Sequence, residues 1–347
     1  MSRMTVSLAL RNQPGRVSEA VRKRVMAVAG KLGYQPDARI TSWMSQVRSS
    51  KTREPVPLAW LNADKDEDVW HRKRELIPYF EGARKRCEEL GFRLVDEFWL
   101  HAPRMTARRM SQILFNRGIR GVIVTPFDKI FHTGLEWGNF AVASFGKSLV
   151  APRLYQATQD YHYNTTLALK HLRRFGYRRI GVFLSAWSDT RSYHACHGAV
   201  AYFHLQVSSE ERVPVLPQRY SFEPGPEFGP WLREHRPDVI VGQHSELVRW
   251  VEAEGYRVPE DIGVVHMALE DDCADWAGVW ACKREIGAAT AELVIAQLHN
   301  NAFGIPVTSQ DVHIQGRWHP GRTLLTPKPV KTQKTPSPKV RRAQRKP

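Results

Sequence analysis

This sequence of 347 residues lacks long apolar runs, a secretion signal and paired cysteines. No stretch approaches the roughly 18 consecutive apolar residues that mark a membrane-spanning helix, and the N-terminus has no apolar signal region. The four cysteines show neither Cys-x-x-Cys spacing nor a disulfide-dense pattern. We therefore expect a cytoplasmic protein with no membrane partner, in which the cysteines are reduced and mostly buried.

Recognisable catalytic motifs are missing as well. The sequence has no Gly-x-Ser-x-Gly elbow and no Gly-x-Gly-x-x-Gly fingerprint, and residues 146–148 (Gly-Lys-Ser) lack the preceding glycine of a phosphate-binding loop because Ala141 stands there. His194 and His197, with Cys196 between them, share a helix face but have no third metal ligand at a fitting spacing. A polar helix face is favoured over a metal site, and we expect no enzyme activity and no cofactor.

Basic charge is concentrated at the two ends of the chain. The net charge is +16, and residues 1–53 hold eleven Lys/Arg against two acids, which gives +9. Residues 328–347 hold eight Lys/Arg and no acid, so the rest of the chain carries about −1. This distribution predicts that the ends contact nucleic acid phosphates, although such runs can also act only as solubilising segments. The last twenty residues have no apolar periodicity, which predicts a disordered tail.

Two short helices are predicted at the N-terminus. Val6, Ala9 and Leu10 recur at helical spacing before a break at residues 12–15 (Asn-Gln-Pro-Gly). A second helix follows, for which Ser18 is the expected N-cap. Its apolar stripe is Val21, Val25, Val28 and Leu32, and Gly33 is the expected C-terminal stop.

The N-terminal residues resemble the DNA-binding segment of the lac repressor/galactose repressor (LacI/GalR) family of transcription regulators. The resemblance rests on four motifs at fixed offsets, Thr5-Val6-Ser7-x-Ala9-Leu10-Arg11-Asn12, Val17-Ser18-Glu19, Arg22-x-Arg24-Val25 and Leu32-Gly33-Tyr34-x-Pro36-Asp37. It implies that the helix of residues 3–11 is the recognition helix of a helix-turn-helix, which reads the major groove of operator DNA. The family has a further helix before this one, so we expect the true start codon to lie upstream of Met1.

The resemblance also assigns DNA-binding roles to individual residues. Arg3, Met4 and Leu8 are expected to face base edges, with Arg3 on guanine, while Ser2, Thr5 and Ser7 lie near phosphates. Residues 38–55 resemble the hinge helix and linker, in which Trp43 and Met44 stand at and beside the position of the minor-groove wedge. These two side chains can equally serve dimer packing. The predicted DNA-binding set is Ser2, Arg3, Met4, Thr5, Ser7, Leu8, Arg11, Trp43 and Met44.

From residue 56 onward, short apolar strands alternate with amphipathic helices. This pattern predicts an α/β fold with parallel sheets covered on both faces. The expected strands of a first unit are residues 58–61, 94–100, 121–125 and 141–145, with helices at 80–91 and 106–116. A second unit is expected to contain strands 180–184, 239–241 and 263–266 and helices 165–175, 193–205, 245–254 and 286–298.

The second half of the chain also resembles the family, for example at residues 171–180, 255–263 and 316–323. The resemblance implies a two-lobed effector domain similar to periplasmic sugar-binding proteins, with chain crossings between the lobes. The domains expected are thus a partial helix-turn-helix headpiece (1–37), a hinge and linker (38–55), a two-lobed effector-binding and dimerisation domain (56–326) and a disordered basic tail (327–347).

A ligand is expected in the cleft between the two lobes, outside the carboxyl ends of the strands. After the strand of residues 263–266 come acidic and indole side chains, a mixture that suits a carbohydrate because carboxylates accept hydrogen bonds from hydroxyls and indoles cover C–H surfaces. A solvated acidic loop with core tryptophans is the alternative. The predicted effector-binding residues are Asp160, Arg191, His194, Asp271, Asp272, Trp276 and Trp280. The family's usual arginine, three residues before Gly198, is replaced by Ala195.

Taken together, these features predict a homodimeric, sequence-specific DNA-binding transcription regulator, a repressor, whose affinity for double-stranded operator DNA changes when a small carbohydrate-like effector binds. The alternative is a free-standing carbohydrate-binding module that has lost DNA binding through its incomplete headpiece. A sugar-modifying enzyme is the third possibility, but it lacks an assembled nucleophile and base.

Overall fold

The computed structural model describes residues 5–6, 9, 18–32, 54–126, 131–132, 134–218, 223–269 and 273–325. The chain divides into two compact units, Met1–Glu54 and Pro55–Pro347. In the first unit, Thr5, Val6 and Ala9 are helical, and helix α2 spans Glu19–Lys31. The predicted second helix is therefore confirmed.

The apolar stripe of α2 is only partly buried. Val25 is buried, while Val28 and Leu32 are 52% and 77% exposed. Ser18 occupies the N-cap position, but its side chain makes no capping hydrogen bond. The predicted DNA-binding residues other than Thr5, and the hinge and the tail, lie outside the described residues. They stay predictions.

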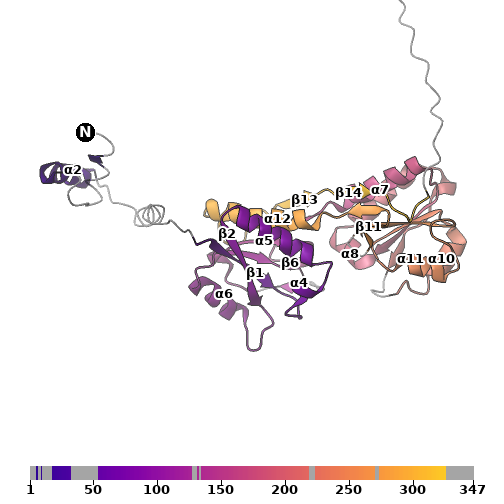
Figure 1. Ribbon diagram of the computed structural model, residues 1–347, viewed down its shortest axis with the longest axis horizontal. Helices are drawn as coiled ribbons and strands as arrows, with labels where there is room; N and C mark the ends of the chain where they lie inside the picture. The colour runs from indigo at the N-terminus through magenta and orange to yellow at the C-terminus, as the bar shows by residue number, and fades with distance from the viewer. Residues whose placement is uncertain are drawn as a thin grey trace, which may run out of the picture. The chain divides into compact units, whose positions relative to one another are not determined.

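The second unit contains two lobes, each built on a six-stranded sheet (Figure 1). The first sheet has the order β13-β7-β5-β3-β1-β2, and its paired strands all run parallel. Its strands are β1 (Val56–Asn62), β2 (Phe92–Trp99), β3 (Gly121–Val124), β5 (Ala141–Phe145), β7 (Tyr155–Gln159) and β13 (Asp311–Ile314). The short strands β4 (Phe131–His132) and β6 (Leu149–Ala151) pair separately.

Helices cover both faces of the first sheet because alternate residues of its strands are apolar on both sides. One face carries Leu58, Trp60 and Ile123 and packs against the helices α5 and α12. The other carries Leu61 and Val122 and packs against α6. The helices of this lobe are α4 (Val69–Arg72), α5 (Ile77–Glu89), α6 (Ala107–Asn116), η1 (Trp137–Asn139) and α12 (Lys283–His299).

The second sheet has the order β14-β12-β11-β10-β8-β9, in which only the described pair β12–β14 is antiparallel. Its strands are β8 (Ile180–Ser185), β9 (Leu216–Gln218), β10 (Val239–Gly242), β11 (Gly263–Leu269), β12 (Gly278–Trp280) and β14 (Arg317–His319). One face packs against α7 and α9, and the other against α10 and α11. The helices are α7 (Tyr161–Phe175), α8 (Ala186–Arg191), α9 (Ala195–Leu205), η2 (Ser209–Glu211), α10 (Phe228–His235) and α11 (Leu247–Ala253).

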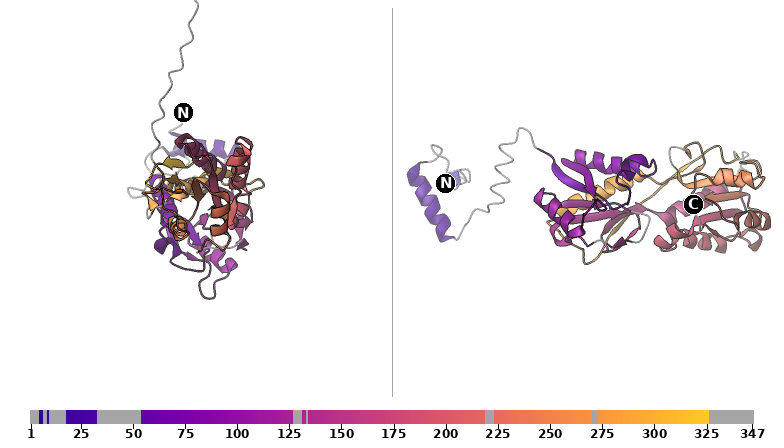
Figure 2. Two further views of the ribbon diagram at one scale, coloured as in Figure 1. Left: turned by 90° about the vertical axis from the view of Figure 1, so that its right-hand side faces the viewer. Right: turned by 90° about the horizontal axis from the view of Figure 1, so that it is seen from below.

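The chain passes between the lobes three times, from β7 to α7, from β12 to α12 and from β13 to β14. The right-hand view of Figure 2 shows this connection as extended chain between the two lobes. The last helix, α12, packs against α5 in the first lobe, and Figure 1 shows it in orange beside the purple α5. This helix was predicted to belong with the strands of the second lobe, and this was wrong, because an apolar stripe does not reveal which sheet the helix covers.

Two predicted helix starts also differ from the structure. Helix α7 begins four residues early, at Tyr161, because the Asp160 side chain accepts a hydrogen bond from the Tyr163 amide and so caps it. Helix α9 begins two residues late, at Ala195, because Tyr193 and His194 have left-handed backbones with φ of 56° and 58°.

Candidate functional site

A cavity of about 260 Å³ lies where the two lobes meet. The first lobe contributes the start of α5 and the N-terminus of α12, and the second lobe contributes the ends of β11 and β12 and the start of β14. The lining residues are Arg74, Glu75, Pro78, Leu269, Trp280, Cys282, Lys283, Arg284, Glu285 and Arg317. The cavity thus lies at the carboxyl ends of strands, as predicted for a ligand site in tandem α/β sheets.

Lys283, the first residue of α12, connects the two helices of the cavity wall. Its Nζ donates a hydrogen bond to the backbone carbonyl of Glu75 at 2.9 Å and lies 5.8 Å from the centre of the Tyr79 ring. Tyr79 in turn stacks on Phe145 at 5.0 Å, at the carboxyl end of β5. The cavity wall is therefore continuous with the ends of the first-lobe strands.

The loop after β5 brings the first lobe close to a second part of the other lobe. Lys147, two residues after Phe145, forms an ion pair with Asp311 and lies 6.0 Å from the ring centre of Tyr193. Tyr193 belongs to the turn between α8 and α9, and its side chain is 74% exposed. The turn and the cavity consequently contribute to one border between the lobes.

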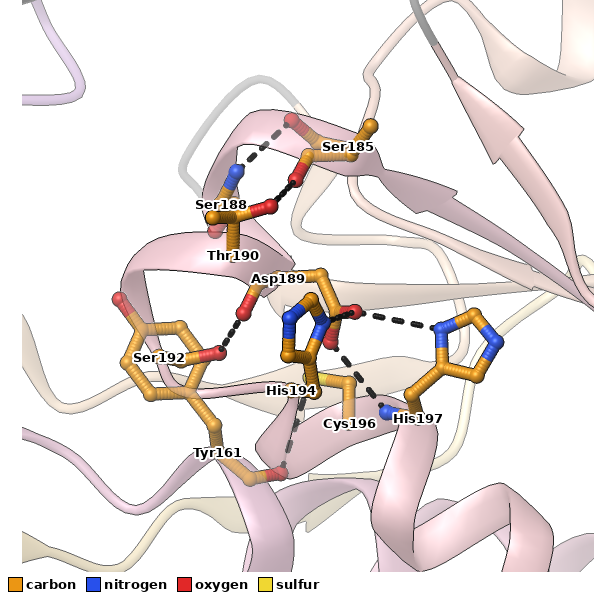
Figure 3. Close-up of polar contacts among 10 residues, drawn as sticks. Tyr161, Ser185, Ser188, Asp189, Thr190, Ser192, His194, Cys196 and His197 are labelled. Atoms are coloured by element: carbon orange, nitrogen blue, oxygen red, sulfur yellow. Dashed lines mark hydrogen bonds and ion pairs between the residues drawn. The ribbon is translucent and has the colours of Figure 1, made fainter.

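A buried carboxylate organises the turn between α8 and α9. Asp189 is only 5% exposed, and its side chain accepts hydrogen bonds from Nδ1 of His194 at 3.0 Å and from Nδ1 of His197 at 3.2 Å. The His197 backbone amide also donates to this carboxylate. Figure 3 shows both imidazole rings directed at the Asp189 carboxylate. Because a carboxylate accepts only, both rings carry their proton on Nδ1 and leave Nε2 for another partner.

The backbone of this turn holds an unusual conformation. Two consecutive residues other than glycine, Tyr193 and His194, are left-handed, which costs of the order of 1 kcal/mol each. The amide of His194 donates to the carbonyl of Asp189 at 2.8 Å, and the hydroxyl of Ser192 donates to the same oxygen at 3.0 Å. These bonds fix a loop that presents one tyrosine and two half-exposed histidines at the end of β8.

The predicted effector-binding residues occupy three different places. Arg191 and His194 share the α8–α9 turn, where the guanidinium of Arg191 lies 3.2 Å from the ring centre of Trp187. Asp160 caps α7 at a lobe crossing. Trp280 lines the cavity. The structure therefore places these side chains at the lobe border but gathers only two of them into one cluster.

The remaining predicted effector residues are placed differently or lie outside the described residues. Trp276 is 7% exposed and packs into the core of the second lobe, with its ring centre 6.1 Å from that of His266. This placement fits the alternative of a core tryptophan. Asp271 and Asp272 lie outside the described residues.

The prediction that His194 and His197 share a helix face was wrong, because His194 has a left-handed backbone and precedes helix α9, which begins at Ala195. Both rings use Nδ1 on Asp189, and the thiol of Cys196 points to the carbonyl of Tyr161. Burial raises the pKa of Cys196 to about 11, which disfavours the thiolate that a metal would need. Within the described residues, no group of three or more His, Cys, Asp or Glu side chains is placed to hold a metal ion.

Sequence reasoning missed the basic side chains of the cavity, Arg74, Lys283, Arg284 and Arg317. About 200 residues separate the first from the others, so no local motif joins them. A partial signal was present, since Lys283 and Arg284 stand where the last apolar helix begins. Basic residues at a helix N-terminus oppose the helix dipole and therefore suggest a purpose other than helix stability.

Comparisons with known proteins point in one direction. Residues 1–37 match the family model described as bacterial regulatory proteins, lacI family. No curated protein matches this chain in sequence. Within the described residues, no helix has the length and apolar character needed to cross a bilayer.

Several solved structures share the fold of most of the chain. A complex of the transcriptional regulator CelR with cellobiose has a TM-score of 0.55 at 16% identity, covering 93% of this chain and 96% of the other. A lac repressor dimer bound to operator and the anti-inducer ONPF has a TM-score of 0.54 at 15% identity, covering 94% and 96%. A LacI family regulator from Enterococcus faecium with bound ribose has a TM-score of 0.51 at 14% identity, covering 78% and 99%. The predicted two-lobed α/β fold is confirmed.

Proposed function

We infer that this LacI-family chain, so identified by its N-terminal segment and its fold, is a DNA-binding transcription regulator that responds to a carbohydrate-like effector. One observation carries this proposal. The chain combines a lacI-family segment at residues 1–37 with a two-lobed unit that has a cavity at the lobe border. Neither part alone distinguishes a regulator from a binding module. We assign it the role of a repressor that acts as a homodimer.

The DNA-binding part of the proposal rests on residues 1–55. Residues 1–53 carry a charge of +9, which favours phosphate contacts, and Arg3 is the residue proposed to read guanine. Trp43 is proposed as the side chain that enters the minor groove. Ser2, Met4, Thr5, Ser7, Leu8, Arg11 and Met44 complete the proposed DNA-binding set.

The effector part rests on the lobe border. Two solved structures of the same fold are complexes with cellobiose and with ribose, which supports a carbohydrate-like ligand for this protein. Trp280 in the cavity offers an apolar face, and His194 offers its Nε2 nitrogen from the α8–α9 turn. Asp160, Arg191, Asp271, Asp272 and Trp276 remain proposed contributors.

Regulation requires that the effector prefer one arrangement of the lobes. A ligand that touches both lobes stabilises the arrangement in which both walls reach it, and it changes DNA affinity only by this difference in binding free energy. A coupling of about 1–3 kcal/mol, which corresponds to about 5- to 150-fold in operator affinity, is typical of such systems.

The test is a fluorescence-anisotropy titration of DNA from upstream of the protein's own gene, at two salt concentrations. The chain as given and a version extended through any in-frame upstream codons are compared, with a scrambled duplex as the DNA control. Arg3→Ala is expected to weaken specific binding about tenfold or more, the size of one bidentate base contact. Arg93→Ala, on the exposed side of β2, is the matched control.

Specific binding by either version, with the predicted loss in Arg3→Ala alone, supports the regulator. If both versions bind the scrambled duplex as tightly as the upstream DNA, the regulator is refuted and a carbohydrate-binding module is the better account.

A further inference from the structure

We propose that residues 328–347 and a basic cluster on the second lobe form a further DNA-binding surface, which holds the phosphate backbone of a duplex independently of base sequence. This goes beyond the proposed function, in which residues 1–55 bind the operator, and it does not depend on operator recognition. The basic cluster consists of the described side chains Lys170, Arg173, Arg174, Arg178, Arg179, Arg212 and Arg236.

The basic cluster lies at the edge of the second sheet where the strands β8 and β10 begin. Arg178 and Arg179 directly precede β8, and Arg236 stands three residues before β10. The guanidinium of Arg179 donates to the backbone carbonyls of His235 at 3.1 Å and of Arg236 at 3.3 Å, so the two segments are held together. The cavity at the lobe border lies at the opposite edge, where β11 and β12 end.

The segments that carry the basic cluster have an excess of positive charge. Residues 170–179, 209–212 and 235–238 hold seven Lys/Arg against three acids, which gives +4. The acidic residues 270–272 follow β11 in the chain, where that strand ends at the opposite edge of the sheet. They are therefore not attached to the edge that carries the cluster.

Carboxylates neutralise only part of the cluster. Glu211 pairs with Arg173 at 3.0 Å and lies 3.7 Å from Arg178, whose side chain is 62% exposed. Lys170 and Arg174, one helical turn apart on α7, are exposed and form no ion pair with any described residue. Exposed cations without a carboxylate partner attract an external polyanion.

Residues 328–347 are tethered next to this cluster. The amide of Leu325 donates a hydrogen bond to the hydroxyl of Tyr177 at 3.1 Å, and Tyr177 directly precedes Arg178 in the sequence. The segment holds eight Lys/Arg and no acid, and fully extended it spans at most about 70 Å. The cluster and the segment thus bring charges of +4 and +8 to one end of the second lobe.

The composition of the segment favours duplex DNA over other polyanions. Residues 328–347 contain no aromatic residue and no Leu, Ile or Met. Proteins that bind single strands stack bases on aromatic side chains, and segments that bind membranes bury large apolar side chains, so this segment lacks both means. Duplex DNA carries about one charge per 1.7 Å and requires only cations. DNA is the duplex expected because residues 1–37 match a family of bacterial regulatory proteins.

The test uses fluorescence anisotropy to measure binding of the full chain to a random-sequence DNA duplex at 50 and 200 mM salt. The cluster variant is Lys170→Gln with Arg174→Gln. The tail variant combines Lys334→Gln, Lys339→Gln, Arg341→Gln and Arg342→Gln. The control variant is Arg93→Gln with Arg109→Gln, two exposed arginines of the first lobe.

Both test variants are expected to bind the random duplex roughly tenfold or more weakly at 50 mM salt, and the control variant is expected to bind like the wild type. Each lost phosphate contact makes the slope of log K against log salt shallower by about 0.9, so we expect a change of about 1.8 for the cluster variant and about 3.6 for the tail variant. A Tm equal to that of the wild type checks that each variant is folded. The tail variant changes no residue of the two-lobed unit, so it keeps the test decisive if the cluster variant unfolds.

The proposal is overturned if the cluster variant or the tail variant, once folded, binds the random duplex with the affinity and salt slope of the control variant. It is also overturned if the two variants lose as much affinity for single-stranded DNA of the same length, or for phosphatidylserine vesicles, as for the duplex. The operator titration with Arg3→Ala is independent of these outcomes. Absence of operator-specific binding refutes the regulator alone, whereas control-like cluster and tail variants refute this surface alone.

Discussion

Gly82 and Gly287 allow the helices α5 and α12 to cross in close contact at the edge of the cavity. A Cβ atom on Gly287 would lie 2.0 Å from the carbonyl oxygen of Tyr79, and one on Gly82 would lie 2.0 Å from that of Arg284. Both obstacles are backbone atoms, so neither can move aside without shifting a helix. The crossing sets the separation of Lys283 from Glu75 and hence the shape of the cavity wall.

Gly287→Ala is expected to destabilise the two-lobed unit by about 1–3 kcal/mol, because an added methyl group in a close helix crossing forces backbone shifts. Urea unfolding followed by tryptophan fluorescence measures this change. The matched control is Gly198→Ala in α9, where an added Cβ meets no atom within 4 Å. There, alanine is expected to stabilise by up to about 1 kcal/mol through its higher helix propensity. Equal effects at the two positions would contradict the close crossing.

Asp189→Asn is expected to lower the free energy of unfolding by about 1–3 kcal/mol, because two imidazoles and one amide lose the buried carboxylate to which they donate. The comparison is Asp275→Asn, which removes an exposed ion pair with Arg322 and is expected to cost less than about 1 kcal/mol. Chemical unfolding of both variants provides the measurement. A loss for Asp189→Asn no larger than for Asp275→Asn would show that the cluster in Figure 3 does not fix the turn.

Much of the fold could be predicted because each strand and helix leaves a local pattern. The strand of residues 141–145 was predicted with the bounds observed for β5. The packing partner of a helix or strand is not a local property of the sequence, and this is why α12 was placed in the wrong lobe. The close α5–α12 crossing depends on two glycines that are 205 positions apart, and no local periodicity contains both.

The site was predictable only in part for the same reason. Ligands of α/β sheets bind outside the carboxyl ends of strands, so residues that follow strands, such as Trp280 and His194, could be predicted from the sequence. Arg74 and Lys283 could not be paired, since only the return of the chain to the first lobe brings them to one cavity. Asp271 and Asp272 were expected to bind a carbohydrate and lie outside the described residues, whereas four of the described lining residues of the cavity are basic.

Cys282 is expected to be the first of the four cysteines to react with N-ethylmaleimide. Burial raises the pKa of Cys87 to about 12 and that of Cys196 to about 11, and Cys273 is buried too, whereas Cys282 is half-buried in the cavity wall. Mass spectrometry after timed labelling identifies the modified residue. Labelling of Cys196 before Cys282 would contradict the assigned burial.

Stability is expected to fall as the pH drops below about 6.5, partly because of His171. This ring stacks on Trp318 with 4.6 Å between centres, and burial, followed by the charge of Arg174, lowers the pKa of His171. The folded protein then binds a proton less readily than the unfolded chain, so the contribution of His171 to stability is complete above the ordinary pKa and is lost as the pH falls through the lowered value.

His171→Phe keeps an aromatic ring on Trp318 but cannot titrate, and the difference in its Tm between pH 7.5 and 5.5 is expected to be smaller than that of the wild type. Burial also lowers the pKa of His204, so the double variant with His204→Phe is expected to lose still more of the pH dependence. An unchanged pH dependence in both variants would assign the acid sensitivity to other groups.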